Sequence, residues 1–200
     1  MRSLLLTEMQ GLMNPMTAFM RRDRQAGFSI TELLMVLAAV VVIIGLSVPM
    51  LASAMRDIQL SSDVRNIATT LSYAKMNSTS EMTHCRLVLD LDDNLWSMEK
   101  LNKSTSNFEL QEDTYFLSSG IGNSGITFEA NFEPAPSGFP MSSSSVITFN
   151  SHGIPVDGSG VPTTDNIIYI SNAENEYAVT VSLSGKVQIW RFENNRWTAQ

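Results

Sequence analysis

The chain of 200 residues has almost no cysteine. Its one cysteine, Cys85, cannot form an internal disulfide, so the folded part has to be held together by its hydrophobic core. A single cysteine also gives no information about the redox compartment. The location of the protein therefore has to be inferred from targeting signals.

Residues that carry out catalysis are equally sparse. Of the two histidines, His84 is adjacent to Cys85 and His152 lies far away in the sequence. A cysteine nucleophile needs a base within hydrogen-bond distance, whereas adjacent residues of a strand point to opposite faces of a sheet. We therefore expect no enzymatic activity and no cofactor, with Cys85 buried and His84 at the surface.

Positive charge is also scarce. Thirteen Lys and Arg residues stand against twenty Asp and Glu residues, which gives a net charge of −7. An acidic protein is repelled by nucleic acid, which argues against a nucleic-acid partner. The C-terminus does mix basic with aromatic residues, a combination that can bind single strands. The residues concerned are Lys186, Trp190, Arg191, Phe192, Arg196 and Trp197. With only three cations, and Glu193 among them, we interpret this segment as a final strand pair whose aromatic side chains pack in a sheet.

Charged residues are absent altogether from residues 33–55. As a helix this run would be about 35 Å long, and a bilayer core of about 30 Å needs roughly 20 apolar residues. Twelve Leu, Ile or Val residues lie between Leu33 and Leu51, and together they favour insertion by about 4–7 kcal/mol. Gly45 and Pro49 interrupt the run, but a membrane helix tolerates such breaks when neighbours satisfy its backbone. The run predicts a membrane-spanning helix.

The flanks of the run predict its orientation. Arg21, Arg22 and Arg24 precede it, and Arg56 is the first charge that follows it. The positive-inside rule then places the N-terminus in the cytoplasm and residues 56–200 outside.

A cleaved secretory signal peptide is the alternative for this run. Ala52-Ser53-Ala54 resembles a cleavage site. However, the apolar region of a signal peptide is normally about 7–15 residues long, and here the run is longer and has an acidic residue at its start.

That acidic residue is Glu32. A lone carboxylate at a membrane is costly and usually has a partner, yet no Lys or Arg follows until Arg56. If the chain were cut after Gly27, the new amino group of Phe28 would supply a positive charge. In a bundle of identical helices, Glu32 could pair with this amine of its neighbour and set the axial register. The alternative is that Glu32 lies in the headgroup region without a specific partner.

Residues 21–34 have the sequence Arg-Arg-Asp-Arg-Gln-Ala-Gly-Phe-Ser-Ile-Thr-Glu-Leu-Leu. They resemble the class III signal of type IV pilins and type II secretion pseudopilins. The resemblance implies cleavage between Gly27 and Phe28 by a prepilin peptidase on the cytoplasmic side, followed by N-methylation of Phe28. It also makes Glu32 the assembly residue, at the fifth position of the mature chain, and Pro49 matches a proline common in this helix.

The leader of residues 1–27 is long for this family. Four internal methionines could be the true start, namely Met9, Met13, Met16 and Met20. With the leader removed, nine basic and eighteen acidic residues remain, so the mature chain has a net charge of −9.

Residues 28–55 would then form the transmembrane and polymerisation helix, and residues 56–78 its amphipathic continuation. We expect this continuation to end near Lys75 or Asn77 and to pack one apolar stripe on the sheet. The stripe consists of Met55, Ile58, Val64, Ile67, Ala68, Leu71 and Ala74. The other faces carry Asp57, Ser61, Ser62, Asp63, Arg65, Asn66 and Thr70.

For residues 79–200 the sequence pattern predicts an extracytoplasmic β-rich head. Alternation over 85–91, a turn at Asp92-Asp93-Asn94 and a return over 95–100 indicate a hairpin. Further strands are expected near 108–117, 126–132, 146–150, 167–171, 177–183 and 186–192, with a tight turn at Ser184-Gly185 and loops over 118–125 and 134–145. The expected fold class is α+β and pilin-like: a long N-terminal helix packed on an antiparallel sheet or pair of sheets.

Two late segments add a further resemblance. Phe149-Asn150-Ser151-His152-Gly153 and Ser184-Gly185-Lys186-Val187-Gln188-Ile189 resemble two blocks of the GspH/FimT group of minor pseudopilins. In that group a Phe-x-x-x-Gly segment precedes a Gly-Lys/Arg-Val strand near the C-terminus.

A calcium site is a weaker hypothesis. Asp90, Asp92 and Asp93, with Asn94, could offer oxygen ligands to an ion that takes six to eight of them. Their spacing is not that of an EF-hand loop, and a hairpin turn explains them equally well. We therefore predict no bound metal.

The resemblance implies a minor pseudopilin, a structural subunit of a type II secretion pseudopilus in the bacterial inner membrane. It would be single-pass, with a periplasmic head, and its partners would be other pseudopilins, the prepilin peptidase and secreted cargo. One alternative is a FimT-like minor type IV pilin for pilus assembly, adhesion, motility or DNA uptake. An alternative of another class is a membrane-anchored binding domain that never polymerises.

Overall fold

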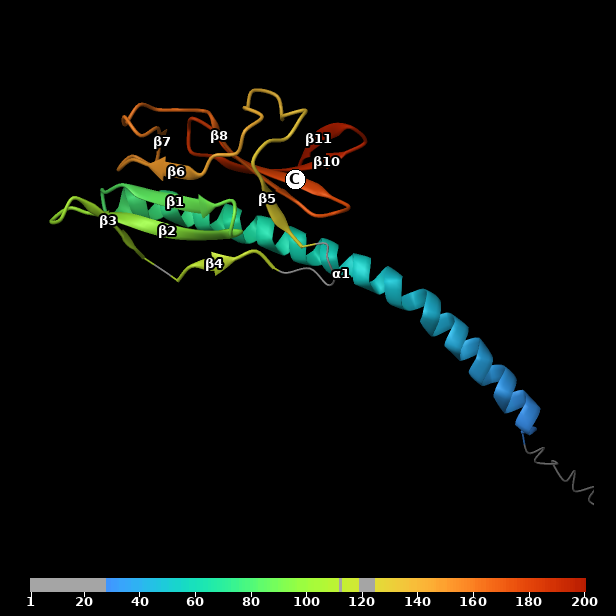
Figure 1. The fold of residues 1–200 in the computed structure, drawn as a ribbon. Coiled ribbons are helices and arrows are strands. Elements are labelled where there is room, and N and C mark those ends of the chain that lie inside the picture. Colours follow the sequence, from blue (N-terminus) through green and yellow to red (C-terminus); the bar gives the residue numbers. More distant parts are fainter. Residues whose placement is uncertain (1–27, 112, 119–124) are drawn as a thin grey trace, which may run out of the picture. The chain divides into compact units, whose positions relative to one another are not determined.

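The computed structural model describes residues 28–111, 113–118 and 125–200. The chain divides into two compact units, residues 1–44 and residues 45–200. The described part of the first unit, residues 28–44, holds only the beginning of the helix α1, Ile30–Ser80 (Figure 1). The second unit contains the rest of α1 and all the strands of the described chain.

The described strands of the second unit form two antiparallel sheets. The first, called sheet A, has the order β3-β2-β1-β6-β7, with β4 also paired to β2. Its strands are β1 (Cys85–Asp90), β2 (Leu95–Asn102), β3 (Asn107–Leu110), β4 (Tyr115–Phe116), β6 (Val146–Phe149) and β7 (Pro155–Val156). The second, called sheet B, has the order β11-β10-β9-β8-β5. Its strands are β5 (Thr127–Glu129), β8 (Asn166–Ser171), β9 (Glu176–Val181), β10 (Val187–Glu193) and β11 (Arg196–Ala199).

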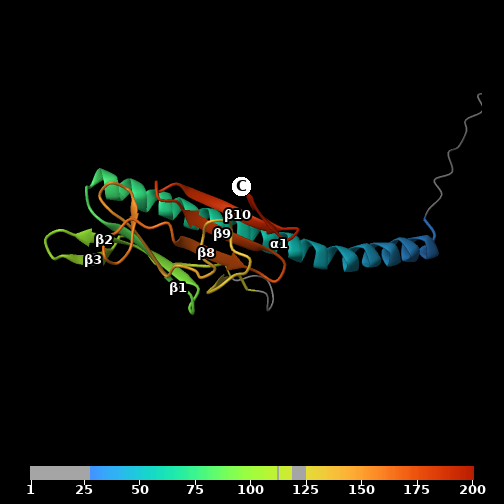
Figure 2. The same cartoon turned by 90° about the horizontal axis from the view of Figure 1, so that it is seen from above.

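The C-terminal half of α1 and the faces of both sheets that are turned toward it share one hydrophobic core. The helix contributes Leu60, Val64, Ile67, Leu71 and Ala74, which are all buried. Sheet A contributes side chains such as Leu87, Met98 and Phe149, and sheet B contributes others such as Ile168 and Val179. This is the predicted pilin-like α+β architecture, with a long N-terminal helix packed on a pair of antiparallel sheets (Figures 1 and 2).

Sheet B is covered on its other face as well. Ile167, Tyr169 and Ala178 form a second buried cluster there, against Phe132, Ala135, Phe139, Trp190 and Trp197. As a result every residue of β8 is buried. A strand that is covered on both faces reads as a continuous apolar run rather than an alternating one.

Most predicted strands are confirmed, including the first hairpin, in which Cys85 pairs with Lys100 and Asp90 with Leu95. The strand predicted over 108–117 is wrong as one element, because β3 and β4 pair separately with different parts of β2. The short strands β7 and β11 were not predicted. Most of the loop predicted over 118–125 lies outside the described residues.

The helix ends later than expected, at Ser80 rather than near Asn77. The Oγ of Ser78 donates to the carbonyl of Lys75 at 2.7 Å, so this hydroxyl bonds back to the helix instead of stopping it. Met82 then adopts a φ of 49°, and the N–H of Thr83 donates to the carbonyl of Ser78 at 3.0 Å. A left-handed residue with this backbone bond is the Schellman helix ending.

The predicted helix stripe needs three corrections. Met55 and Ile58 are exposed, whereas Leu60 is fully buried, so the core-facing stripe begins at Leu60. Asp63, expected on a polar face, is only 3 % exposed. Its Oδ2 accepts from the N–H of Ser118 at 2.7 Å and its Oδ1 accepts from the Oγ of Ser118 at 2.9 Å. The inward-facing carboxylate thus joins the helix to Ser118, in the segment that follows β4.

Burial raises the pKa of Asp63 above its ordinary value of 3.8, although the two bonds from Ser118 act in the opposite direction. A raised pKa in the folded state means that this group stabilises the fold most below about pH 4, and that this stability is lost as the pH rises through the folded pKa. We predict that the wild type loses stability relative to Asp63→Asn as the pH rises above about 4.

Urea unfolding of the full chain in detergent at several pH values measures this difference. Asp63→Ala, which leaves the Ser118 donors without a partner, should be destabilised by about 1–3 kcal/mol. A stability difference between the wild type and Asp63→Asn that stays constant with pH would contradict the prediction.

Candidate functional site

The first part of α1 has an exposed apolar surface. Large apolar side chains between Leu33 and Leu46 are each at least 42 % exposed, among them Leu34, Val41 and Ile44. By length and composition α1 can cross a membrane, and none of its most apolar 18-residue window is buried in the described structure. Among the described residues it is the one helix with this property. Soluble proteins rarely expose a continuous apolar surface of this kind unless another molecule or a membrane covers it.

Phe28 precedes the first turn of this helix. Its side chain is 83 % exposed, and it lies two residues before the helix begins at Ile30. The carbonyl of Ser29 accepts the N–H of Leu33 at 3.1 Å, which makes Ser29 the N-cap position. Gly27, on the other side of the predicted cleavage, lies outside the described residues.

Glu32 lies in the first turn of α1, where the helix dipole favours a negative charge. Its side chain is exposed, and no hydrogen bond or ion pair joins it to another described residue. A carboxylate at the start of an apolar helix is costly in a membrane unless a cation meets it. Within the described chain the geometry therefore leaves Glu32 available to a partner from another molecule.

The two late segments that resemble the GspH/FimT blocks meet at the other end of α1. Gly153 follows β6 and Gly185 lies in the turn between β9 and β10. Lys75, on the last turns of the helix, donates from its Nζ to the carbonyls of Ser184 at 3.1 Å and Gly185 at 3.0 Å. Helix, sheet A and sheet B thus come together at one point, which we call the glycine junction: Lys75, Gly153 and Gly185.

The glycine junction has no room for larger residues. A Cβ at Gly185 would lie 2.3 Å from the carbonyl oxygen of Gly153 and 3.0 Å from Lys75. A Cβ at Gly153 would lie 2.9 Å from the Cγ2 of Thr79. Both glycines also have φ above +70°, a conformation that other residues adopt only at a cost. The sequence resemblance identified these positions, and the structure supplies the reason for them.

Cys85 is fully buried in the core. Burial raises the pKa of its thiol to about 11, with a smaller contribution from the charge of Glu81. Because the thiolate is the nucleophile, a thiol with this pKa is unreactive near neutral pH. His152 is exposed on the turn after β6.

Asp90 organises the hairpin turn in which the calcium candidates lie. Its Oδ1 accepts the N–H groups of Asp92 at 3.1 Å and Asp93 at 3.0 Å. Asn94 has a φ of 55°, and its Oδ1 accepts the N–H of Phe128 at 2.8 Å. Among the described residues, no three His, Cys, Asp or Glu side chains gather around one point where they could bind an ion together.

The aromatic residues near the C-terminus pack on the outer face of sheet B. Trp197 contacts Phe132, Tyr169 and Phe192 with ring centroids 5.1–5.9 Å apart. The Nε1 of Trp190 donates to the Oγ1 of Thr180 at 2.9 Å. These rings are therefore engaged with the fold rather than presented as a stacking surface.

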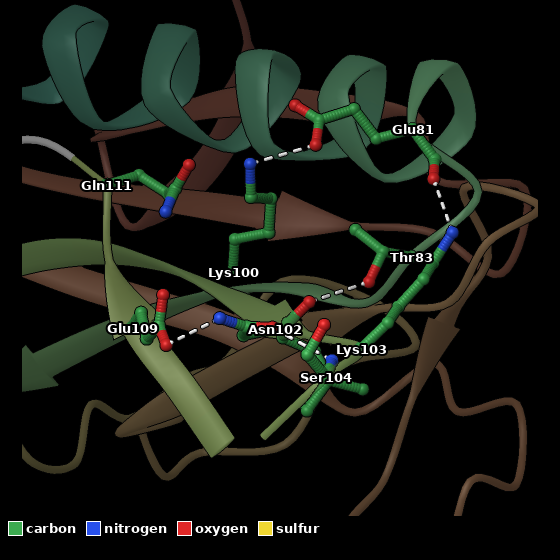
Figure 3. Close-up of a pocket in the computed structure, with 9 residues that line it drawn as sticks. Glu81, Thr83, Lys100, Asn102, Lys103, Ser104, Glu109 and Gln111 are labelled. Carbon is green, nitrogen blue, oxygen red and sulfur yellow. Dashed lines mark hydrogen bonds and ion pairs between the residues drawn. The ribbon is translucent and has the colours of Figure 1, made fainter. Parts of the chain in front are cut away.

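A polar pocket opens where the end of α1 meets β2 and β3 (Figure 3). Within it Lys100 Nζ donates to the carboxylate of Glu81 at 2.8 Å, and Lys103 Nζ donates to the Glu81 carbonyl at 2.9 Å. Asn102 donates to Glu109 at 2.7 Å. The charged groups of this pocket form hydrogen bonds with one another, and these bonds join the end of the helix to the hairpin of sheet A.

Comparisons with known proteins were made by sequence and by structure. No protein-family model matches the chain, and no curated protein sequence matches it. Several solved structures resemble it in fold. The minor pseudopilin EpsH of the type II secretion system of Vibrio cholerae is 13 % identical, with a TM-score of 0.45, over 70 % of this chain and 97 % of that chain. The type IV minor pilin FimU of Pseudomonas aeruginosa is 15 % identical, with a TM-score of 0.47, over 72 % of this chain and 95 % of that chain.

A second crystal structure of the Vibrio cholerae protein EpsH gives 12 % identity and a TM-score of 0.44, over 66 % of this chain and 92 % of that chain. Values this low carry no argument about function.

The glycine junction yields a stability prediction. Gly185→Ala forces a methyl group against the carbonyl of Gly153, and overpacking of this kind costs about 1–3 kcal/mol. Gly160→Ala is the matched control, because Gly160 also has a positive φ of 80° but has open space around its Cβ position. Urea unfolding should show a larger loss for Gly185→Ala by about this amount. Equal losses in the two variants would show that the close packing is unimportant.

Proposed function

We propose that this chain is a minor pseudopilin, a structural subunit of a type II secretion pseudopilus. In this proposal residues 1–27 are removed by a prepilin peptidase on the cytoplasmic side, and Phe28 becomes the methylated first residue. The helix then spans the inner membrane once, with the head in the periplasm.

The observation that carries the proposal is the division of α1 into two halves. The first half exposes apolar side chains on all sides, and the second half buries one face in the head. A membrane anchor needs only an apolar surface. The carboxylate of Glu32 at the start of that surface is what favours assembly, because it needs a cation from a neighbouring subunit, and the amine of Phe28 on such a neighbour would supply it.

The head would make the contacts with other proteins. Lys75 and the two glycines join the helix to both sheets, and the head that they hold together would contact neighbouring subunits or secreted cargo. A minor type IV pilin of a surface pilus would use the same helix and the same assembly residue. A strain that lacks the gene separates these two functions. Loss of exoprotein secretion that the gene restores indicates the pseudopilus, and loss of surface pili that the gene restores indicates the pilus.

Replacement of Glu32 tests assembly. We predict that Glu32→Ala remains in the membrane but disappears from the sheared filament fraction, because removing one partner of an ion pair in an apolar environment costs about 3–5 kcal/mol. The control is Asp92→Ala, which removes an exposed carboxylate from the head. Immunoblots of membrane and filament fractions give both readouts. Normal incorporation of Glu32→Ala would contradict this role of Glu32, and absence of the wild type itself from the filament fraction would indicate a membrane-anchored binding domain that does not polymerise.

A further inference from the structure

A second pocket lies beside the first turns of α1 that follow the charge-free run. It encloses about 460 Å³ and is bounded by α1 on one side and by β9 and β10 on the other. Figure 2 shows α1 running alongside β9 and β10 of sheet B. The helix contributes Ser61, Ser62 and Arg65, and the sheet contributes Tyr177 and Arg191.

Several polar groups of this pocket lack partners in the described structure. The guanidinium of Arg65 and the hydroxyls of Ser61 and Ser62 make no hydrogen bond or ion pair with any described residue. Arg65 is exposed, so its side chain is free to turn toward a ligand. A guanidinium and two hydroxyls in one concave site form a donor set that suits a phosphate.

The other charged groups of the pocket are held by the protein. Arg191 donates to the Oδ1 of Asn175 at 3.0 Å and pairs with Glu193 at 3.0 Å. Asp57 accepts from the Nδ2 of Asn175 at 2.6 Å. The Asp57 carboxylate lies at the edge of the pocket nearest the charge-free run, so a ligand with a second negative charge would be repelled there.

The position of the pocket identifies the source of the phosphate. Arg65 lies nine residues beyond Arg56, or about 14 Å along the helix. Helical side chains lean toward the N-terminus, so the Arg65 side chain reaches back toward the membrane. The polar layer of a bilayer is about 5–8 Å thick on each side. If the polar layer begins near Arg56, its outer edge lies about 6–9 Å before Arg65 along the helix, a distance that a long arginine side chain leaning toward the membrane can cover.

The apolar residues at the pocket agree with this location. Ile58 is 64 % exposed at its membrane side and continues the exposed apolar surface of Met55. Tyr177 forms a wall of the pocket, and its side chain is buried in the head.

We propose that this pocket binds the zwitterionic headgroup of a membrane phospholipid. Arg65, Ser61 and Ser62 contact the phosphate, and the carboxylate of Asp57 faces the amine of a phosphoethanolamine group. The lipid would fix the orientation of the head relative to the membrane before the subunit enters a filament. This proposal rests on membrane insertion of α1, which is part of the proposed function.

Native mass spectrometry of the full chain in detergent tests the pocket by titration with defined lipids. We expect phosphatidylethanolamine to bind more tightly than phosphatidylglycerol, and diacylglycerol, which lacks the phosphate, not to bind. Arg65→Gln should weaken phosphatidylethanolamine binding about tenfold or more, because a charge-assisted hydrogen bond is lost. The control is Arg196→Gln, an exposed arginine on β11 outside the pocket, which should bind as the wild type does.

The proposal would be overturned by equal binding of diacylglycerol, by tighter binding of phosphatidylglycerol, or by equal affinities of the two arginine variants. Free phosphoethanolamine that binds as tightly as the lipid would overturn the membrane source. If Arg65→Gln binds lipid normally but fails to enter filaments, the pocket is a subunit contact and the lipid proposal is wrong. Glu32→Ala should bind lipid normally, so failure of assembly and failure of this proposal are distinguishable.

Discussion

One helix has to satisfy two different surroundings, and the rest of the structure depends on this constraint. Up to Leu46 the apolar side chains of α1 point in every direction and are exposed. From Leu60 the helix is amphipathic, and one face is fully buried. A helix that is apolar all round is stable only where no face meets water, whereas an amphipathic helix needs a partner on one face. The sequence changes from the first pattern to the second within about four turns.

The head is built on the second pattern. With one cysteine and no disulfide in the described chain, its rigidity comes from packing and from a few polar ties to the helix. Asp63 ties the helix to the segment after β4, and Lys75 ties it to the turn of sheet B. Between these two points the buried face of α1 contacts both sheets, so the helix is the element around which the head is organised.

Local patterns predicted much of this fold. The hairpin of β1 and β2 follows from strict alternation around a turn, and Gly185 follows from the turn residues between two apolar runs. Long-range contacts were beyond such patterns. The burial of Asp63 depends on Ser118, which lies 55 residues away. The strand β11 is short, and its pairing with β10 is not visible as an alternation of its own.

The residues of the candidate site also fall into those predicted from local sequence patterns and those that only the fold brings together. The roles of Gly27, Phe28 and Glu32 are predictions from a local signal. The meeting of Gly153 with Gly185 required the fold, because their neighbours come from distant parts of the chain. Sequence reasoning also missed Arg65 as a site residue. It reads as an ordinary polar position of an amphipathic helix, and only its place beside Tyr177 and Arg191 distinguishes it.

Pairing of Glu32 with a neighbouring subunit requires that Phe28 becomes the first residue, since only then does an amine exist for Glu32 to meet. The intact mass of the protein purified from membranes measures this directly. The mass should equal residues 28–200 plus one methyl group. A chain that still begins at Met1 or at an internal methionine, or one that begins at Met55 after cleavage as a signal peptide, would contradict the account.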